Sequence, residues 1–181
     1  MAFLGLFGRR QHERAGFSLY TAAVRAARDP YFYAELGVAD TMDGRFDMIG
    51  LYAFLLIDRL HKEPKPGPEL AQAVFDAMFS DMDHTLRELG VGDTGVGRRV
   101  KAMWEALHGR GQAYAAPLQA GDRAGLAAAI ARNVWRGAPD GGGAETLADL
   151  ALRQHRHLAG QGLPALLAGR VEFLPPMPVA A

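Results

Sequence analysis

The chain has 181 residues, with 20 basic and 20 acidic side chains, no cysteine, 49% hydrophobic residues and 22% charged residues. This composition is typical of a globular protein, and one domain of this length buries about 70% of its unfolded surface, enough to fold without a disulfide or a metal. The absence of cysteine excludes disulfides, thiolate metal sites and thiol nucleophiles, and the balanced charge argues against a strongly basic DNA-binding protein.

The spacing of apolar residues predicts helices along most of the chain, and no long segment alternates with the period of two that marks a strand. Proline, glycine and capping residues divide the pattern into segments. We expect helices at 18–29, with Ser18 as its N-cap, and at 30–36, 45–61, 68–89, 94–118, 122–134 and 144–159. The sequence therefore predicts an all-α fold, a single bundle of about six to eight helices with a short irregular C-terminal tail.

The longest uncharged apolar run is Met48 to Ile57. Ten helical residues span about 15 Å, roughly half of a bilayer core, so this run predicts a buried central helix and not a membrane span. We expect no transmembrane segment.

The two ends differ from the helical middle. Residues 1–16 predict a flexible N-terminus without the pattern of a signal or transit peptide, because the apolar part is short and its arginines follow it. The alternative is a small anchor that touches a membrane through Phe3, Leu4, Leu6 and Phe7. Residues 138–170 predict additional helices, 170–174 a short extended piece, and 171–181 a proline-rich tail.

Three motifs suggest chemistry that their context does not support. Residues 90–95 fit the G-x-G-x-x-G pattern, but they follow a helix instead of a strand. We therefore expect a helix cap and an interhelical turn, with Asp93 or Thr94 capping the next helix.

Asp76, Asp81 and Asp83 are five and two residues apart, a spacing that does not suit a metal site on one helix face. Asp83 is instead expected to form an i,i+4 ion pair with Arg87. The six histidines and two serines show no catalytic or zinc-binding spacing.

Charge is unevenly distributed along the chain. Residues 29–88 hold twelve acidic and five basic residues, a net charge of −7, and residues 98–136 hold seven basic and two acidic residues, a net charge of +5. The two segments can pack together and offset each other, or they can present two charged faces to partners.

Methionine and aromatic residues are more numerous than one apolar stripe per helix needs. The residues in question are Tyr31, Phe32, Tyr33, Met48, Met78, Phe79, Met82, Met103 and Trp104. One interpretation is a helix buried on all sides of a bundle. The other is a soft groove that repacks around apolar segments of another polypeptide.

Several runs, in this order and at this spacing, resemble the ubiquinol–cytochrome c chaperone family. They are D-P-Y-F-Y-A-E-L-G-V-A-D at 29–40, D-G-R-F-D at 43–47, F-S-D-M-D at 79–83, L-R-E-L-G-V-G-D at 86–93 and V-G-R-R-V-K at 96–101. The resemblance covers about residues 18–137, and we assign 17–137 to a helical domain of this family.

This resemblance implies a non-catalytic assembly chaperone for ubiquinol–cytochrome c reductase, respiratory complex III. The expected partner is newly made cytochrome b, with the ribosome, a small partner protein and the membrane surface as further implied partners. It implies no cofactor, no metal and no DNA partner, and it argues against a small-molecule ligand. For the location it implies a bacterial protein in the cytoplasm, with a peripheral position at the inner face of the cytoplasmic membrane as an option.

We assign partner binding to six residues on two predicted helices: Phe79, Met82, Arg98, Arg99, Lys101 and Met103. The first rival hypothesis is a carrier or enzyme that holds a quinone or another lipid in a pocket inside the bundle. The second is a structural subunit of mature complex III.

Overall fold

The computed structural model describes the backbone of residues 2–88, 90 and 92–176, and the side chains of these residues except 2–9, 93 and 94. Its helices are α1 (Ala2–Ala27), α2 (Pro30–Ala34), α3 (Met42–His61), α4 (Gly67–Glu88), α5 (Asp93–Ala120), α6 (Arg123–Ile130), the π-helical turn η1 (Ala131–Trp135), α7 (Gly143–Ala159) and α8 (Leu163–Leu167). The described residues contain no strand, so the predicted all-α fold is confirmed.

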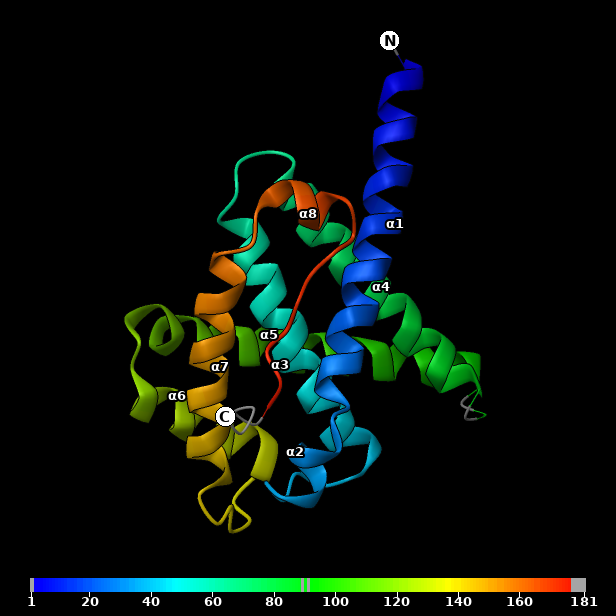
Figure 1. Cartoon of the computed structure of the whole chain (residues 1–181). Helices are drawn as coiled ribbons and strands as arrows, with labels where there is room; N and C mark the ends of the chain where they lie inside the picture. Colours follow the sequence, from blue (N-terminus) through cyan, green and yellow to red (C-terminus); the bar gives the residue numbers. More distant parts are fainter. Residues whose placement is uncertain (1, 89, 91, 177–181) are drawn as a thin grey trace.

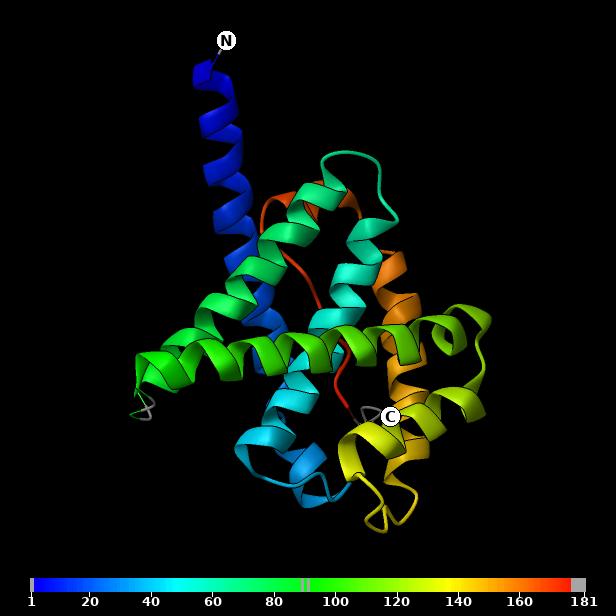
Figure 2. The same cartoon turned by 180° about the vertical axis from the view of Figure 1, so that it is seen from behind.

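Helix α3 runs through the middle of the bundle (Figures 1 and 2). It contacts α1, α4, α5 and α7, and most of the run from Met48 to Ile57 is buried. The prediction of a buried central helix is therefore confirmed. None of the described helices combines the length and the apolar character needed to cross a bilayer.

Side-chain caps begin several helices where the sequence places them. The Asp29 carboxylate accepts a hydrogen bond from the Tyr31 amide at 3.0 Å, and the Asp122 carboxylate accepts one from the Gly125 amide at 2.9 Å. Each cap partners an amide that the first turn of a helix leaves free. Helix α3 begins at Met42, three residues before the predicted start, because the Thr41 hydroxyl accepts from the Gly44 amide.

Helix α1 differs from its prediction. It begins at Ala2, and its first turns extend beyond the bundle (Figure 1). Ser18 is not an N-cap, because its hydroxyl donates to the Arg14 carbonyl at 3.1 Å inside the helix. The helix thus covers most of residues 1–16, whose flexibility remains a prediction.

The G-x-G-x-x-G segment connects two helices, as predicted. Helix α4 ends at Glu88, Gly90 has a φ of +77°, and α5 begins at Asp93. Neither Asp93 nor Thr94 is the cap, because Gly92 occupies the N-cap position and offers no side chain. Leu89 and Val91 lie outside the described residues.

The C-terminal segment crosses the bundle as an extended chain (Figure 1). Two glutamines hold it: the Gln154 side chain exchanges two hydrogen bonds with the backbone of Leu174, and the Gln161 side chain does the same with Glu172. Phe173 packs edge-on against Tyr52 of α3. The extended piece predicted at 170–174 is therefore present, although it pairs with side chains and not with a strand. The tail beyond residue 176 lies outside the described residues.

Candidate functional site

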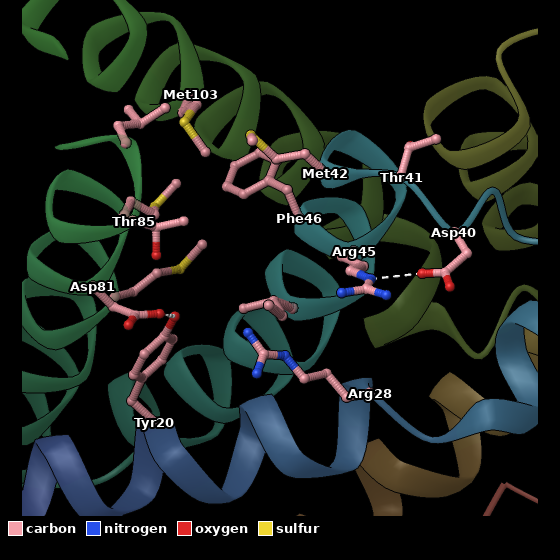
Figure 3. A pocket seen from close by; sticks show the side chains of 14 residues that line it. Tyr20, Arg28, Asp40, Thr41, Met42, Arg45, Phe46, Asp81, Thr85 and Met103 are labelled. Atoms are coloured by element: carbon pink, nitrogen blue, oxygen red, sulfur yellow. Dashed lines mark hydrogen bonds and ion pairs between the residues drawn. The ribbon is translucent and has the colours of Figure 1, made fainter. Parts of the chain in front are cut away.

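A cavity of about 420 Å³ lies between α1, α3, α4 and α5 (Figure 3). One side is apolar and the other carries charged and hydroxyl groups. The apolar lining consists of Met42, Phe46, Ile49, Met78, Met82, Leu86 and Met103, and the polar lining of Tyr20, Arg28, Asp40, Thr41, Arg45, Asp81 and Thr85.

Hydrogen bonds organise the polar side of this cavity. The Tyr20 hydroxyl of α1 donates to the Asp81 carboxylate of α4 at 2.7 Å, and burial, reinforced by that carboxylate, raises the pKa of Tyr20. The Arg45 guanidinium donates to Asp40 at 2.6 Å and holds the pKa of that carboxyl below its usual value. Tyr20 therefore keeps its proton, while Asp40 stays ionised.

A second cavity of about 470 Å³ adjoins the first on the side of α5. The two share a wall made of Thr41, Met42, Phe46, Leu86 and Met103, and the second adds Asp43, Arg99 and Ala102. We call the two cavities together the methionine groove. Met42 is 43% exposed, so the groove offers apolar surface to solvent.

The D-G-R-F-D run at 43–47 shapes this wall. A β-carbon at Gly44 would lie 1.9 Å from the Ala39 carbonyl oxygen, so only glycine fits where the backbone of the preceding loop approaches the first turn of α3. Phe46 lines both cavities, and the Arg110 guanidinium of α5 lies 5.3 Å from the centre of its ring, a cation–π contact.

Asp47 is fully buried and joins three elements. Its two carboxylate oxygens each lie 2.7 Å from a guanidinium nitrogen, one of Arg110 and one of Arg136. Burial raises the pKa of Asp47 to about 6, although the two arginines oppose this shift. These ion pairs join the acidic segment 29–88 to the basic segment 98–136, so part of the charge imbalance is offset inside the protein.

The structure brings together three of the six predicted partner-binding residues. Met82 and Met103 line the first cavity, and Met103 and Arg99 line the second. Arg98 and Lys101 are exposed on the same helix, outside both cavities. Phe79 is half-buried beside Phe75, with ring centres 4.5 Å apart, and also lies outside them.

The sequence interpretation missed Met42, Phe46 and Leu86 as groove residues. Two of them could have been identified from the sequence. Leu86 belongs to the apolar stripe of α4, and Phe46 is the aromatic residue of the 43–47 run. Met42 gave no periodic signal, because it is the first residue of its helix.

The aspartates of α4 are each engaged by a neighbour. Asp76 accepts from Gln72 at 2.7 Å, Asp81 accepts from Tyr20, and Asp83 pairs with Arg87 at 2.7 Å, as predicted. Among the residues that the structure describes, no group of three or more histidines and carboxylates could hold a metal ion. The apolar wall, and not an ionisable cluster, is therefore the notable chemical feature of the site.

Comparisons with known proteins agree with this architecture. The sequence matches the model of the family described as ubiquinol-cytochrome C chaperone over residues 34–173. The fold matches the crystal structure of the Cbp3 homolog from Brucella abortus with a TM-score of 0.83 and 37% sequence identity, covering 96% of this chain and 97% of that one. No curated protein matches the chain.

Proposed function

Because the chain belongs to the ubiquinol-cytochrome C chaperone family, we propose that it is a non-catalytic assembly chaperone of ubiquinol–cytochrome c reductase. We further propose that its client is newly made cytochrome b, bound at the methionine groove. The observation that supports the binding site is an apolar wall of methionines that remains partly open to solvent.

Methionine side chains suit such a client. They are unbranched and flexible, so one wall can repack around apolar segments of different shape. A membrane protein exposes such segments before it is inserted and assembled, and covering them prevents aggregation. The groove thus shields apolar segments of the client reversibly, without making or breaking covalent bonds.

Charged residues border the groove on α5. Arg99 lines the second cavity, and Arg98 and Lys101 are exposed nearby in the chain. We assign these three residues to contacts with acidic groups of the client or with ribosomal RNA, which would raise association rates more than final affinity. This role places the protein in the cytoplasm, near the inner face of the membrane where the client is made.

A carrier of a quinone or another lipid is the second candidate function. The cavity of about 420 Å³ with one apolar and one polar side lies in the size range of small-molecule sites. Extraction of the purified protein with organic solvent, followed by mass spectrometry, tests this candidate: a quinone or lipid recovered in stoichiometric amount supports the carrier.

Capture of unassembled cytochrome b tests the chaperone assignment directly. In cells that are assembling complex III, Met103→Glu should reduce the cytochrome b that copurifies with the protein by about tenfold, because it buries a charge in the apolar contact. Trp104→Glu is the matched control: Trp104 is the next residue of α5, is 44% exposed, and stacks on His108 outside the groove.

The control variant should capture cytochrome b as the unchanged protein does. Equal capture by all three proteins would rule out the groove as the client site. Stoichiometric copurification with mature complex III would instead identify a structural subunit.

A further inference from the structure

Arg28 borders the methionine groove without an acidic partner. It directly follows the last residue of α1 and lines the first cavity of the groove together with Tyr20 and Arg45. Arg45 is paired with Asp40 at 2.6 Å, whereas Arg28 forms no ion pair with any side chain that the structure describes. The Arg28 guanidinium is therefore available to another molecule.

The Arg28 side chain is directed into this cavity. Figure 3 shows it pointing from the end of α1 toward the space between Tyr20 and Arg45. Burial raises the pKa of Tyr20 and that of Tyr33, and the positive charge of Arg28 opposes both shifts, so this charge lies near both hydroxyl groups. Arg28 is exposed and also lines a neighbouring hollow of about 570 Å³, which leaves its guanidinium open to solvent.

The position of Arg28 at the end of α1 does not by itself account for the residue. A positive charge near the C-terminus of a helix is favourable, because it faces the negative end of the helix dipole. Arg25 already supplies such a charge in the last turn of α1. Arg28 differs from Arg25 because it lines the same cavity as Met42, Met78 and Met82. The cavity thus combines an apolar wall with an unpaired guanidinium.

An acidic side chain within an apolar segment needs this combination. Placing an ionised carboxylate against apolar side chains costs free energy unless an opposite charge and hydrogen bonds compensate for it. In membrane proteins, ionisable residues of the spanning segments face the protein interior and pair there. A newly made segment has not yet formed those pairs, so a guanidinium beside an apolar wall stabilises both its carboxylate and its apolar residues.

On the basis of the client function proposed above, we propose that the methionine groove selects apolar segments that carry an acidic side chain, and that Arg28 pairs with this carboxylate. The apolar residues of the segment lie against the methionine wall, while the carboxylate accepts hydrogen bonds from the guanidinium. Asp81, on the same polar side, attracts a basic side chain instead. The charge that the groove prefers therefore distinguishes Arg28 from Asp81 as the contact.

Fluorescence anisotropy of three labelled peptides with the full-length protein tests this proposal. The peptides share an apolar leucine–alanine sequence with hydrophilic ends, and they differ at one central position, which is glutamate, glutamine or lysine. At low salt we expect the glutamate peptide to bind about fivefold or more tightly than the glutamine peptide, and the lysine peptide to bind most weakly. Added salt should reduce these differences.

Variants of Arg28 assign the preference to one residue. Arg28→Gln should remove the preference for glutamate while the affinity for the glutamine peptide stays nearly constant, and Arg28→Glu should favour the lysine peptide. Arg25→Gln is the matched control, because it removes one positive charge from an exposed position of the same helix outside both cavities, and it should keep the preference. Circular dichroism monitors the folding of each variant.

Three results would overturn the role of Arg28: equal binding of the glutamate and glutamine peptides, a preference for lysine, or an unchanged preference in Arg28→Gln. Met103→Glu with the glutamine peptide tests the groove separately and should weaken binding by about tenfold. If this weakening occurs but the glutamate and glutamine peptides bind equally, the acidic preference is wrong and the groove stands. If the unchanged protein binds none of the peptides, both proposals are wrong.

Discussion

Asp47 is a buried ionisable residue beside Phe46 of the methionine groove, and its charge state depends on pH. Its fully buried carboxylate is paired with Arg110 and Arg136, yet burial raises its pKa from 3.8 to about 6. A raised pKa in the folded state means that this group favours folding most below about pH 4. Its contribution is lost as the pH rises through about 6.

We therefore predict a pH-dependent difference between the unchanged protein and Asp47→Asn. From pH 4 to pH 6.5, the free energy of unfolding of the unchanged protein should fall relative to that of the variant, by about 3 kcal/mol or less. Urea unfolding at several pH values measures the difference. The substitution also removes the charged partner of Arg110 and Arg136, but this changes the free energy of unfolding by the same amount at each pH. A relative rise over the same range would mean that the two arginines stabilise the carboxylate by more than burial costs.

Asp47 also marks a limit of sequence reasoning. The residue directly precedes the apolar run 48–57 inside the predicted helix 45–61, while its partners are distant in the chain and on other elements. Residue spacing reports neighbours on one helix and carries no information on such long-range pairs.

At the scale of elements, helix identity follows from the sequence more readily than helix ends. Asp29, Pro30 and Asp122 start helices as predicted, because their side chains act locally. Ser18 fails as a cap because it bonds backward within a longer helix. On α4, periodicity identifies the apolar stripe, but only packing decides that Met82 lines the groove while Phe79 lies beside Phe75 outside it.

The extended segment near the C-terminus offers a prediction about two glutamines. Gln154 is completely buried, and its amide both donates to and accepts from the backbone of Leu174. Gln154→Leu keeps the side-chain size but leaves those backbone groups unpartnered, so it should lower the free energy of unfolding by about 2 kcal/mol. Urea denaturation measures this loss.

Gln161→Leu is the matched control for that substitution. Gln161 makes the equivalent pair with Glu172, but these hydrogen bonds are exposed to water, which can replace them. Gln161→Leu should therefore lower the free energy of unfolding by less than about 1 kcal/mol. Equal losses in the two variants would show that burial does not make the hydrogen bonds of Gln154 more stabilising than those of Gln161.

At the scale of the whole molecule, net charge is zero while its distribution is not. Ion pairs at Asp47 offset part of the difference between the acidic and basic segments, whereas Arg98 and Arg99 remain exposed on α5. Long-range attraction depends on such exposed charge and weakens with added salt. The two arginines are therefore suited to steering an acidic partner toward the groove.

Arg98→Glu with Arg99→Glu tests steering, because each substitution replaces one positive charge with a negative one. Association with detergent-solubilised cytochrome b should slow by about tenfold at low salt and approach the unchanged rate at high salt, with little change in dissociation. The thermal midpoint should stay nearly constant, since neither side chain is buried. Arg132→Glu with Arg156→Glu is the control, because this variant has the same net charge. If its association slows equally, the effect comes from the overall charge of the protein and not from the arginines beside the groove.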